Sequence, residues 1–328
     1  MIISRTPFRV SFFGGGTDFP EFYGEHGGAV LLTTIDKYCY LSIHQLSQFF
    51  KHRYRAMYSK TESVMDPKEF GHPLIRECLL HVRPRDGLEI SHVSDLPGRT
   101  GLGTSSSFTV GLLNALHSFE GQRATAEDLA REAILIERER VGDAGGHQDQ
   151  YAAAYGGLLR LDFSGPQNVA VRRLALSAKR IGELESRLAL FYTGVESSAE
   201  SILSEQRKRV KQNVECLLRM RAMVDDAEKV LVGRGDLDRF GDLLHESWQL
   251  KKSLSHGISN HAIDEAYETA RKRGARGGKL LGAGGRGFLL LFAPPETHAE
   301  IAAGLKALRN VPFQFSQDGS RIIFQSPE

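Results

Sequence analysis

The segment Pro97–Ser107, PGRTGLGTSSS, is the stretch that decides the expected fold. Its Gly98 and Gly103 have the spacing of a phosphate-binding loop, but Thr104 and Ser105 stand where Lys and then Ser or Thr would follow. The next residues, FTVGLLNALHSFEG, repeat apolar side chains at helical spacing and end on a glycine that can close a helix. We therefore expect a glycine loop, without the usual lysine, that leads into a helix.

A helix N-terminus that follows a glycine loop is suited to bind an anion. Its free backbone amides and the positive end of the helix dipole attract negative charge, and glycines let a ligand approach the backbone. The hydroxyls of residues 104–107 could add hydrogen bonds or a metal ligand. An ordinary helix cap is the alternative, because Ser and Thr are common at this position. Taken alone, the segment leaves a polyphosphate site and a plain cap both open.

Three blocks of the chain, in the expected order, resemble the GHMP small-molecule kinases. The loop is similar to their second signature, roughly PxxxGLGSSA, with Thr104 and Ser106 as mild departures. RTPFRVSFFGGGTDF, residues 5–19, resembles the first signature, and KLLGAGGRGFLLLF, residues 279–292, resembles the third. The resemblance implies a two-domain α+β fold, with a ribosomal-protein-S5-like N-terminal domain, a ferredoxin-like C-terminal domain and an active site between them.

The domain boundary is expected near Gly165 and Pro166, or in the polar stretch that follows. This places the N-terminal ATP-binding domain at residues 1–170 and the C-terminal domain at residues 171–328. Strand-like segments dominate the first hundred residues. Charged helical patterns run from about Ser198 to Arg273, and FQFSQ and RIIFQ close the chain as strands.

The resemblance implies that ATP and Mg²⁺ bind at the glycine loop. It carries the role of holding magnesium over to Ser105. The positions that it assigns to the nucleotide are Gly98, Gly101, Gly103, Thr104, Ser105, Ser106 and Ser107.

Glu137 is the second candidate for the metal. It falls on the apolar stripe of a predicted helix that Thr125 and Asp128 would cap; the stripe comprises Ala130, Ala133, Ile134, Glu137 and Val141. A carboxylate on an apolar face needs a partner, and a magnesium ion that carries ATP phosphates is a suitable one. The alternative is an ion pair with a neighbouring base such as Arg138 or Arg140.

Asp149 follows Glu137 by twelve positions, in HQDQYAAAYGG. The same interval occurs in galactokinases, whose aspartate is catalytic. The resemblance therefore implies that Asp149 accepts the proton of a sugar hydroxyl that attacks the γ-phosphoryl group. Arg9 in the first block would offset the charge that develops on the phosphate. The alternative role of Asp149 is to cap a short helix.

The first block departs from the galactokinase pattern, because Gly15 and Gly16 stand where that pattern has a Glu-His pair. We therefore expect a sugar other than galactose, with Thr17 and Asp18 still placed to bind hydroxyls. GGGTDFPEFY, QDQYAAAYGG and WQLKKSLSHGISNHAID resemble the bacterial sugar 1-kinases of the glycero-manno-heptose 7-phosphate kinase type. This implies phosphorylation of the anomeric C1 hydroxyl of D-glycero-D-manno-heptose 7-phosphate, for nucleotide-activated heptose.

A phosphorylated substrate needs a cationic receptor. Lys251, Lys252 and Arg99 are the candidates, although the two lysines could equally form a solvated helix edge. The expected substrate-binding residues are Gly15, Gly16, Thr17, Asp18, Lys251 and Gly284.

The third block also spells GxGxxG through Gly282, Gly284 and Gly287. That dinucleotide fingerprint requires a following helix, whereas FLLLF reads as a buried strand. A dinucleotide-binding fold is therefore rejected. A simple glycine turn between two strands remains compatible with a kinase.

Composition, with 41% hydrophobic and 25% charged residues, indicates a soluble globular chain of about two domains. The 328 residues carry a net charge of +2, which gives little attraction for nucleic acid. Three cysteines without CxxC spacing favour a reducing compartment, and neither a signal-peptide core nor a membrane-length apolar run occurs. We expect a cytoplasmic protein with a sugar phosphate as its partner and no nucleic acid or membrane.

Other functions remain open at this point. A kinase of the same fold could act on fucose or galactose. A noncatalytic sugar sensor could bind ATP and ligand without turnover, although Arg9, Ser105, Glu137 and Asp149 together argue against it. A decarboxylase related to the diphosphomevalonate enzymes fits less well, because the interval from Glu137 to Asp149 follows the sugar-kinase form.

Overall fold

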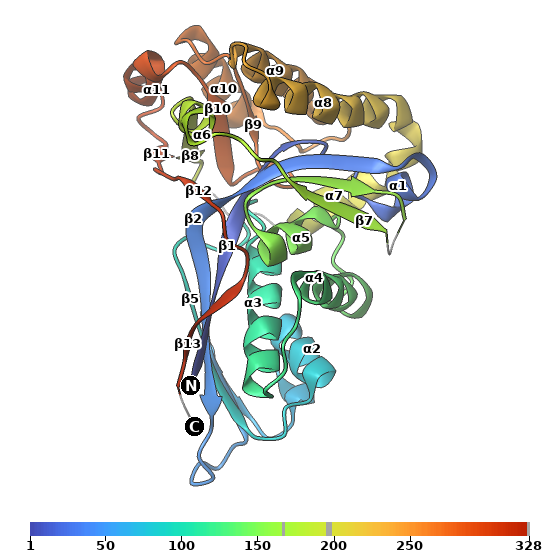
Figure 1. The fold of residues 1–328 in the computed structure, drawn as a ribbon, viewed down its shortest axis with the longest axis vertical. Coiled ribbons are helices and arrows are strands. Elements are labelled where there is room, and N and C mark those ends of the chain that lie inside the picture. Colours follow the sequence, from blue (N-terminus) through green and yellow to red (C-terminus); the bar gives the residue numbers. More distant parts are fainter. Residues whose placement is uncertain (166–167, 195–198, 327–328) are drawn as a thin grey trace.

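The structure is a computed structural model that describes residues 1–165, 168–194 and 199–326. Two separate sheets, each packed against helices, form the mixed helix-and-strand fold that the sequence predicts. In Figure 1 the larger sheet runs from the bottom of the view to its middle, and the smaller sheet lies at the top. Pro166, at the expected domain boundary, and Ser198, at the expected start of the charged helices, lie outside the described residues.

Among the described residues, nine strands form the larger sheet. They are β1 (Ile2–Phe13), β2 (Gly28–Gln45), β3 (Tyr54–Met57), β4 (Thr61–Val64), β5 (Leu88–Ser94), β6 (Leu158–Phe163), β7 (Val169–Arg173), β12 (Phe315–Ser316) and β13 (Arg321–Gln325). Their order is β13-β1-β2-β5-β3-β4, with β6 and β12 on β2 and β7 on β6. The long β2 pairs with β6 through its first half and with β5 through its second half, so it organises the whole sheet.

The helical segments between β1 and β6 accompany the larger sheet, and those that contact its β1 and β2 most are residues 104–119 and 148–155. They are α1 (Pro20–His26), the 3₁₀ turn η1 (Pro67–Glu69), α2 (Pro73–Val82), α3 (Thr104–Phe119), α4 (Ala126–Ile134), the π-helical turn η2 (Leu135–Arg140) and α5 (Gln148–Tyr155). The helix expected after the glycine loop is α3, which packs against β1 and β2 (Figure 1). It also contacts α2, α4 and α5. Its apolar positions are buried, so the predicted helical spacing is confirmed.

The smaller sheet has four strands in the part of the chain that the structure describes, in the order β11-β8-β10-β9. They are β8 (Leu188–Tyr192), β9 (Gly277–Leu280), β10 (Phe288–Phe292) and β11 (Arg309–Asn310). The predicted strand FLLLF is β10, and all five of its residues are buried because it lies between β8 and β9. This central position explains its unbroken apolar run.

Helical segments accompany the smaller sheet, and those between residues 199 and 272 are the charged helices that the sequence predicts. They are α6 (Ala178–Glu185), α7 (Ala199–Lys208), the 3₁₀ turn η3 (Val210–Gln212), α8 (Val214–Val232), α9 (Asp238–Ser253), α10 (His261–Lys272), the 3₁₀ turn η4 (Pro295–Thr297) and α11 (His298–Gly304). A hydrophobic cluster that includes Trp248 and Tyr267 joins them to the sheet. In the part of the chain that the structure describes, no helix is long and apolar enough to cross a bilayer.

The expected division at residue 170 differs from the sheet arrangement in two respects. β7 continues to Arg173 as a partner of β6, and the closing strands β12 and β13 return to pair with β2 and β1. The closing strand β13 accordingly lies beside the N-terminal strand β1 in Figure 1. We propose a first domain that combines the residues up to β7 with the two closing strands, and a second domain between them.

Candidate active site

A cavity of about 1230 Å³ is lined by residues of both parts of the fold. All three signature blocks contribute to its wall, together with the segment from η2 to α5 and with α9. The lining residues include Arg9, Ser11, Gly15, Gly16, Asp18, Gly101, Gly103, Ser105, Ser106, Glu137, Gln148, Asp149, Lys251, Lys279 and Gly282.

The glycine loop is held in place by backbone contacts with the first and third blocks. Arg9 N donates to Leu102 O at 3.0 Å, which attaches the loop to β1. Gly101 has a φ of +82°, and a Cβ there would lie 2.4 Å from the Leu281 carbonyl oxygen. Only glycine fits this approach, so the second and third blocks meet at this residue.

The N-terminus of α3 faces the cavity. Gly98, Gly101, Gly103, Thr104, Ser105 and Ser106 line it, as expected of residues that would contact a nucleotide. Ser107 differs, because its buried hydroxyl donates to Pro7 O at 2.8 Å and the residue is not part of the lining. The Ser107 hydroxyl thus anchors α3 on β1, and a contact between Ser107 and a nucleotide stays a prediction.

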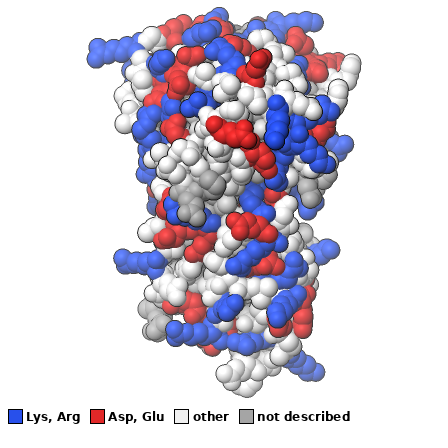
Figure 2. Space-filling model, turned by 90° about the vertical axis from the view of Figure 1, so that its right-hand side faces the viewer, with Lys and Arg blue, Asp and Glu red and all other residues white. Residues whose placement is uncertain are grey.

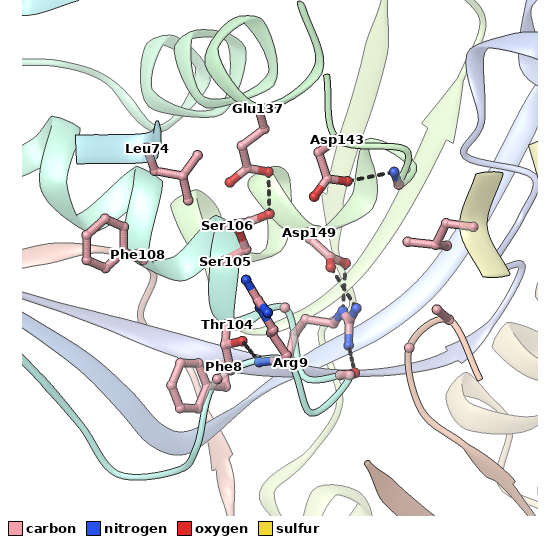
Figure 3. Close-up of a pocket in the computed structure, with 18 of the residues that line it drawn as sticks. Phe8, Arg9, Leu74, Thr104, Ser105, Ser106, Phe108, Glu137, Asp143 and Asp149 are labelled. Carbon is pink, nitrogen blue, oxygen red and sulfur yellow. Dashed lines mark hydrogen bonds and ion pairs between the residues drawn. The ribbon is translucent and has the colours of Figure 1, made fainter. Parts of the chain in front are cut away.

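Glu137, on the π-helical turn η2, contacts the first turn of α3 through Ser106. Its side chain is 1% exposed, and one oxygen, Oε2, accepts hydrogen bonds from Ser106 Oγ at 2.8 Å and from the Gln150 amide (Figure 3). The alternative ion pair is absent among the described residues, since Arg138 instead pairs with Asp143. Burial raises the pKa of the Glu137 carboxyl, against the opposing charge of Arg138.

Asp149 and Arg9 form a bidentate ion pair in the cavity wall (Figure 3). Arg9 Nε and Nη2 each donate to one Asp149 oxygen at 2.7 Å, and Arg9 Nη1 donates to Gly101 O. The Arg9 side chain is 7% exposed and that of Asp149 is 22% exposed. A Cβ on Gly103 would lie 3.4 Å from the Asp149 carboxyl, so the glycine loop and the acid are neighbours.

The loop after β1 supplies a second carboxylate. Asp18 is 2% exposed, and it accepts from Gly16 N at 2.8 Å and from Gln148 Nε2 at 2.9 Å. Thr17 turns the other way: its buried hydroxyl donates to Gly14 O and Ala29 O, and it does not line the cavity. Thr17 thus has a structural role in this turn, and its contact with a sugar stays a prediction.

Two buried lysines face the same end of the cavity. Lys251, on α9, donates to Gly282 O at 3.0 Å, and burial lowers the pKa of its ammonium group to about 8. Lys279, on β9, donates to Phe12 O at 3.0 Å, and burial lowers its pKa well below the usual value. Sequence reasoning missed Lys279, although it opens the KLLGAGG block, because a lysine within a strand normally faces solvent.

Of the remaining predicted substrate residues, two lie outside the cavity lining and one lies within it. Gly284 does not line the cavity; a Cβ there would lie 2.6 Å from Ile258 Cα, so this glycine serves close backbone packing. Lys252 pairs with Asp264 at 3.1 Å and is also outside the lining. Arg99 lines the cavity beside the glycine loop.

The far end of the cavity, past the glycine loop, is apolar and aromatic. Leu74, Leu96 and Phe108 line it, and the His72 and His92 rings lie 5.2 and 5.0 Å from the Phe108 ring. Burial lowers the pKa of both histidines, which favours their neutral forms. These residues were missed because they come from three segments that only the fold brings together.

Comparison with known proteins agrees with this geometry. Residues 73–157 match the family described as GHMP kinases N terminal domain, and residues 225–307 match GHMP kinases C terminal. The chain is 30% identical to a D-glycero-alpha-D-manno-heptose 7-phosphate kinase of Campylobacter jejuni, over 97% of both proteins. The chain is a GHMP kinase.

Two further relatives of this GHMP kinase bear on its fold and substrate. A solved D-glycero-D-manno-heptose 1-phosphate kinase from Bacteroides thetaiotaomicron superposes with a TM-score of 0.81 at 25% identity, over 100% of both chains. A bifunctional fucokinase/GDP-fucose pyrophosphorylase of Arabidopsis thaliana is 28% identical over 88% of this chain and 29% of its own length. The protein is therefore a phosphotransferase that acts on a hydroxyl of a sugar or another small molecule.

GHMP kinases in general use ATP and Mg²⁺, and the residues of this chain fit both. The backbone of the glycine loop and the N-terminus of α3 suit phosphates. Glu137 Oε1 is buried without a hydrogen-bond partner among the described residues, which suits a cation. Since no group of three His, Cys, Asp or Glu side chains gathers in the described part of the chain, other ligands would be hydroxyl, water or phosphate oxygens.

Proposed function

We propose that this GHMP kinase transfers the γ-phosphoryl group of ATP to the anomeric C1 hydroxyl of D-glycero-D-manno-heptose 7-phosphate, giving the 1,7-bisphosphate. The Arg9–Asp149 pair is the observation that supports phosphoryl transfer, because it lies between the glycine loop and the Asp18 end of the cavity. The choice of sugar rests on the Campylobacter relative, which aligns over 97% of both chains.

Asp149 is the proposed base. Its carboxylate would orient the C1 hydroxyl and accept its proton as the oxygen attacks the γ-phosphoryl group. Arg9 holds the carboxylate by two hydrogen bonds and would offset charge that develops on the transferred group. The same guanidinium binds the loop carbonyl of Gly101, so base and phosphate site are fixed relative to each other.

The nucleotide would lie along the rest of the cavity. Backbone amides at the start of α3 would bind the phosphates of ATP. The neutral aromatic end of the cavity around Phe108 would contact the adenine ring. Ser105 and Glu137 would hold Mg²⁺, which neutralises phosphate charge when bound. Ser106 positions Glu137 through its hydrogen bond.

A sugar 1-phosphate is the kind of compound that a nucleotidyltransferase activates, so the proposed kinase reaction would precede a nucleotidyl transfer. The activated heptose would serve lipopolysaccharide, capsule or similar surface glycans. The supply of ATP would place the reaction in the cytoplasm. Figure 2 shows Lys and Arg interspersed with Asp and Glu over the face in view, and the net charge of +2 offers nucleic acid little attraction.

A fucose 1-kinase is the second candidate. The Arabidopsis fucokinase, similar over 88% of this chain, favours it. Both candidates share the nucleotide half and the Arg9–Asp149 pair, and they differ in the sugar alone.

ADP release tests the proposal. Purified protein is assayed with ATP, Mg²⁺ and D-glycero-D-manno-heptose 7-phosphate, D-glycero-D-manno-heptose, D-mannose, L-fucose or D-galactose, and ³¹P NMR locates the new phosphate. The proposal predicts the highest kcat/KM for heptose 7-phosphate, with the new phosphate on C1. A higher value for fucose or galactose would replace the substrate, and ligand binding without ADP release would indicate a sensor.

A further inference from the structure

The space above the Cα of Gly15 is surrounded by three polar side chains from separate elements. A Cβ at Gly15 would lie 3.6 Å from Lys251 Nζ, 3.8 Å from Gln148 Nε2 and 3.9 Å from Ser11 Oγ. The three side chains come from α9, α5 and β1, and all of them line the cavity. We call Gly15, Ser11, Gln148 and Lys251 the Gly15 cradle.

Two polar atoms of the Gly15 cradle have no hydrogen-bond partner among the described residues. Ser11 Oγ and Gln148 Oε1 are both buried and unpaired, and Ser11 as a whole is 6% exposed. A buried polar group without a partner destabilises a fold, so native proteins keep few of them. In a cavity wall, such a pair indicates groups that a ligand satisfies.

The orientation of the Gln148 amide is fixed by its neighbour. Gln148 Nε2 donates to Asp18 Oδ2 at 2.9 Å, and the backbone N of Gln148 donates to the same oxygen at 3.3 Å. Turning the amide would place its oxygen against a carboxylate, so Oε1 remains the free acceptor. The Gly15 cradle therefore offers a donor at Lys251 and a hydroxyl at Ser11, and its unpaired acceptor is Gln148 Oε1, which is bonded to the same amide carbon as the Nε2 atom near Gly15.

This set of groups matches a hydroxyl rather than a phosphate. A hydroxyl both donates and accepts, so it can pair with Gln148 Oε1 and with Lys251 Nζ at once. A phosphate brings only acceptors; it would leave Gln148 Oε1 unpaired and lie close to the Asp18 carboxylate. The reacting hydroxyl is a different one, because it must reach the proposed base Asp149, which Arg9 holds. The three atoms nearest to the Gly15 Cβ position belong instead to Lys251, Gln148 and Ser11.

We propose that the Gly15 cradle binds a non-reacting hydroxyl of the acceptor sugar, and that Gly15 determines specificity by leaving the space in which this hydroxyl lies. The inference rests on the proposed function and adds Ser11 and Gln148 to the sugar site. It also gives a physical reason for glycine at position 15: any side chain would fill the space.

Gly15→Ala tests the inference without disturbing the fold. The backbone of Gly15 is outside the left-handed region, and the new methyl group would meet its nearest neighbour at 3.6 Å, an ordinary contact. The variant should keep the wild-type melting temperature and its affinity for a nonhydrolysable ATP analogue. The KM for the sugar should rise at least about tenfold, the effect of losing one or two buried hydrogen bonds. Gly24→Ala, at an exposed site on α1 with nothing within 4 Å, is the matched control.

Ser11→Ala separates ligand binding from a structural role. Removing an unpaired buried hydroxyl should leave the melting temperature unchanged or raise it, while the KM for the sugar rises. A lower melting temperature with an unchanged KM would show that Ser11 serves the fold alone and would remove it from the Gly15 cradle.

The two heptoses, with and without the 7-phosphate, identify the group that the Gly15 cradle binds. The inference predicts the same fold increase in KM for both sugars in Gly15→Ala. An increase confined to the phosphorylated sugar would assign the Gly15 cradle to the phosphate, and a KM equal to that of Gly24→Ala would overturn the inference. If wild-type protein releases no ADP with any sugar, the proposed function fails. The sugar-induced shift in melting temperature of each variant then decides the inference separately.

Discussion

Replacing Lys251 with Met should make the protein more stable at neutral pH. Lys251 is fully buried on α9, and burial lowers the pKa of its ammonium group from 10.5 to about 8, although Asp18 nearby opposes the change. At pH 7 the buried group is therefore still charged. Met has a similar length and no charge, so the variant removes the desolvation penalty while it keeps most of the packing.

The size of the effect follows from the two pKa values. The interval between 10.5 and about 8 corresponds to about 3 kcal/mol, at about 1.4 kcal/mol for each pH unit. The hydrogen bond from Lys251 Nζ to Gly282 O is lost, which offsets about 1 kcal/mol. The variant should thus exceed the wild type by about 2 kcal/mol in free energy of unfolding at pH 7.

The pH dependence has a definite sign. Below pH 8 both folded and unfolded wild type hold the proton, so the penalty is constant. Between about pH 8 and 10.5 the unfolded chain still binds it and the folded chain does not, so wild-type stability rises with pH relative to the variant. The difference should close by about 3 kcal/mol across this window and should end slightly in favour of the wild type.

Urea unfolding followed by tryptophan fluorescence measures this difference. The single tryptophan, Trp248, is buried one turn before Lys251 on the same helix. Lys252→Met is the matched control, because Lys252 is partly exposed and paired with Asp264. Equal stability of wild type and Lys251→Met at pH 7, or a difference that stays constant from pH 7 to 10, would refute a buried ammonium at this site.

Three other substitutions probe separate parts of the account. Glu137→Gln should raise the Mg²⁺ concentration for half-maximal activity about tenfold or more without loss of stability, since it removes a buried charge; an unchanged metal titration would exclude Glu137 as a ligand. Glu228→Gln should lower stability by about 1 to 2 kcal/mol at pH 7, because Arg172 and Arg160 hold the pKa of Glu228 at about 2. That loss should shrink as the pH falls from 4.5 toward 2, and urea unfolding at both ends of this range checks it. Thr125→Ala should lower the melting temperature by the equivalent of about 1 kcal/mol, through loss of the capping box, whereas no change would contradict the cap.

Sequence patterns predicted the elements that local spacing encodes. The helix after the glycine loop, the strand FLLLF and the cap at Thr125 all formed as expected, because each depends on residues within a few positions. The burial of Glu137 was also predicted from its apolar stripe. The π-helical turn that carries Glu137 was not, since such a turn has the same side-chain pattern as the helix that precedes it.

Long-range features escaped prediction for a different reason. β12 and β13 return to pair with β2 and β1 of the larger sheet. The sequence of a strand does not indicate which other strand it pairs with. Thr17 and Ser107 match their signatures in sequence, yet their hydroxyls turn toward backbone carbonyls of β1 and its neighbours. The signatures thus located the cavity, while the direction of each side chain required the fold.

The central claim is that Asp149, held by Arg9, serves the acceptor and not the nucleotide. Asp149→Asn keeps the size of the side chain and one acceptor for Arg9, and Asp143→Asn is the control, a cavity carboxylate already paired with Arg138. The measurement is kcat with heptose 7-phosphate beside the Kd of a nonhydrolysable ATP analogue. We expect kcat to fall at least about 100-fold in Asp149→Asn alone, with the Kd within about threefold of wild type. Retained kcat, or a matching loss of nucleotide affinity, would contradict this assignment.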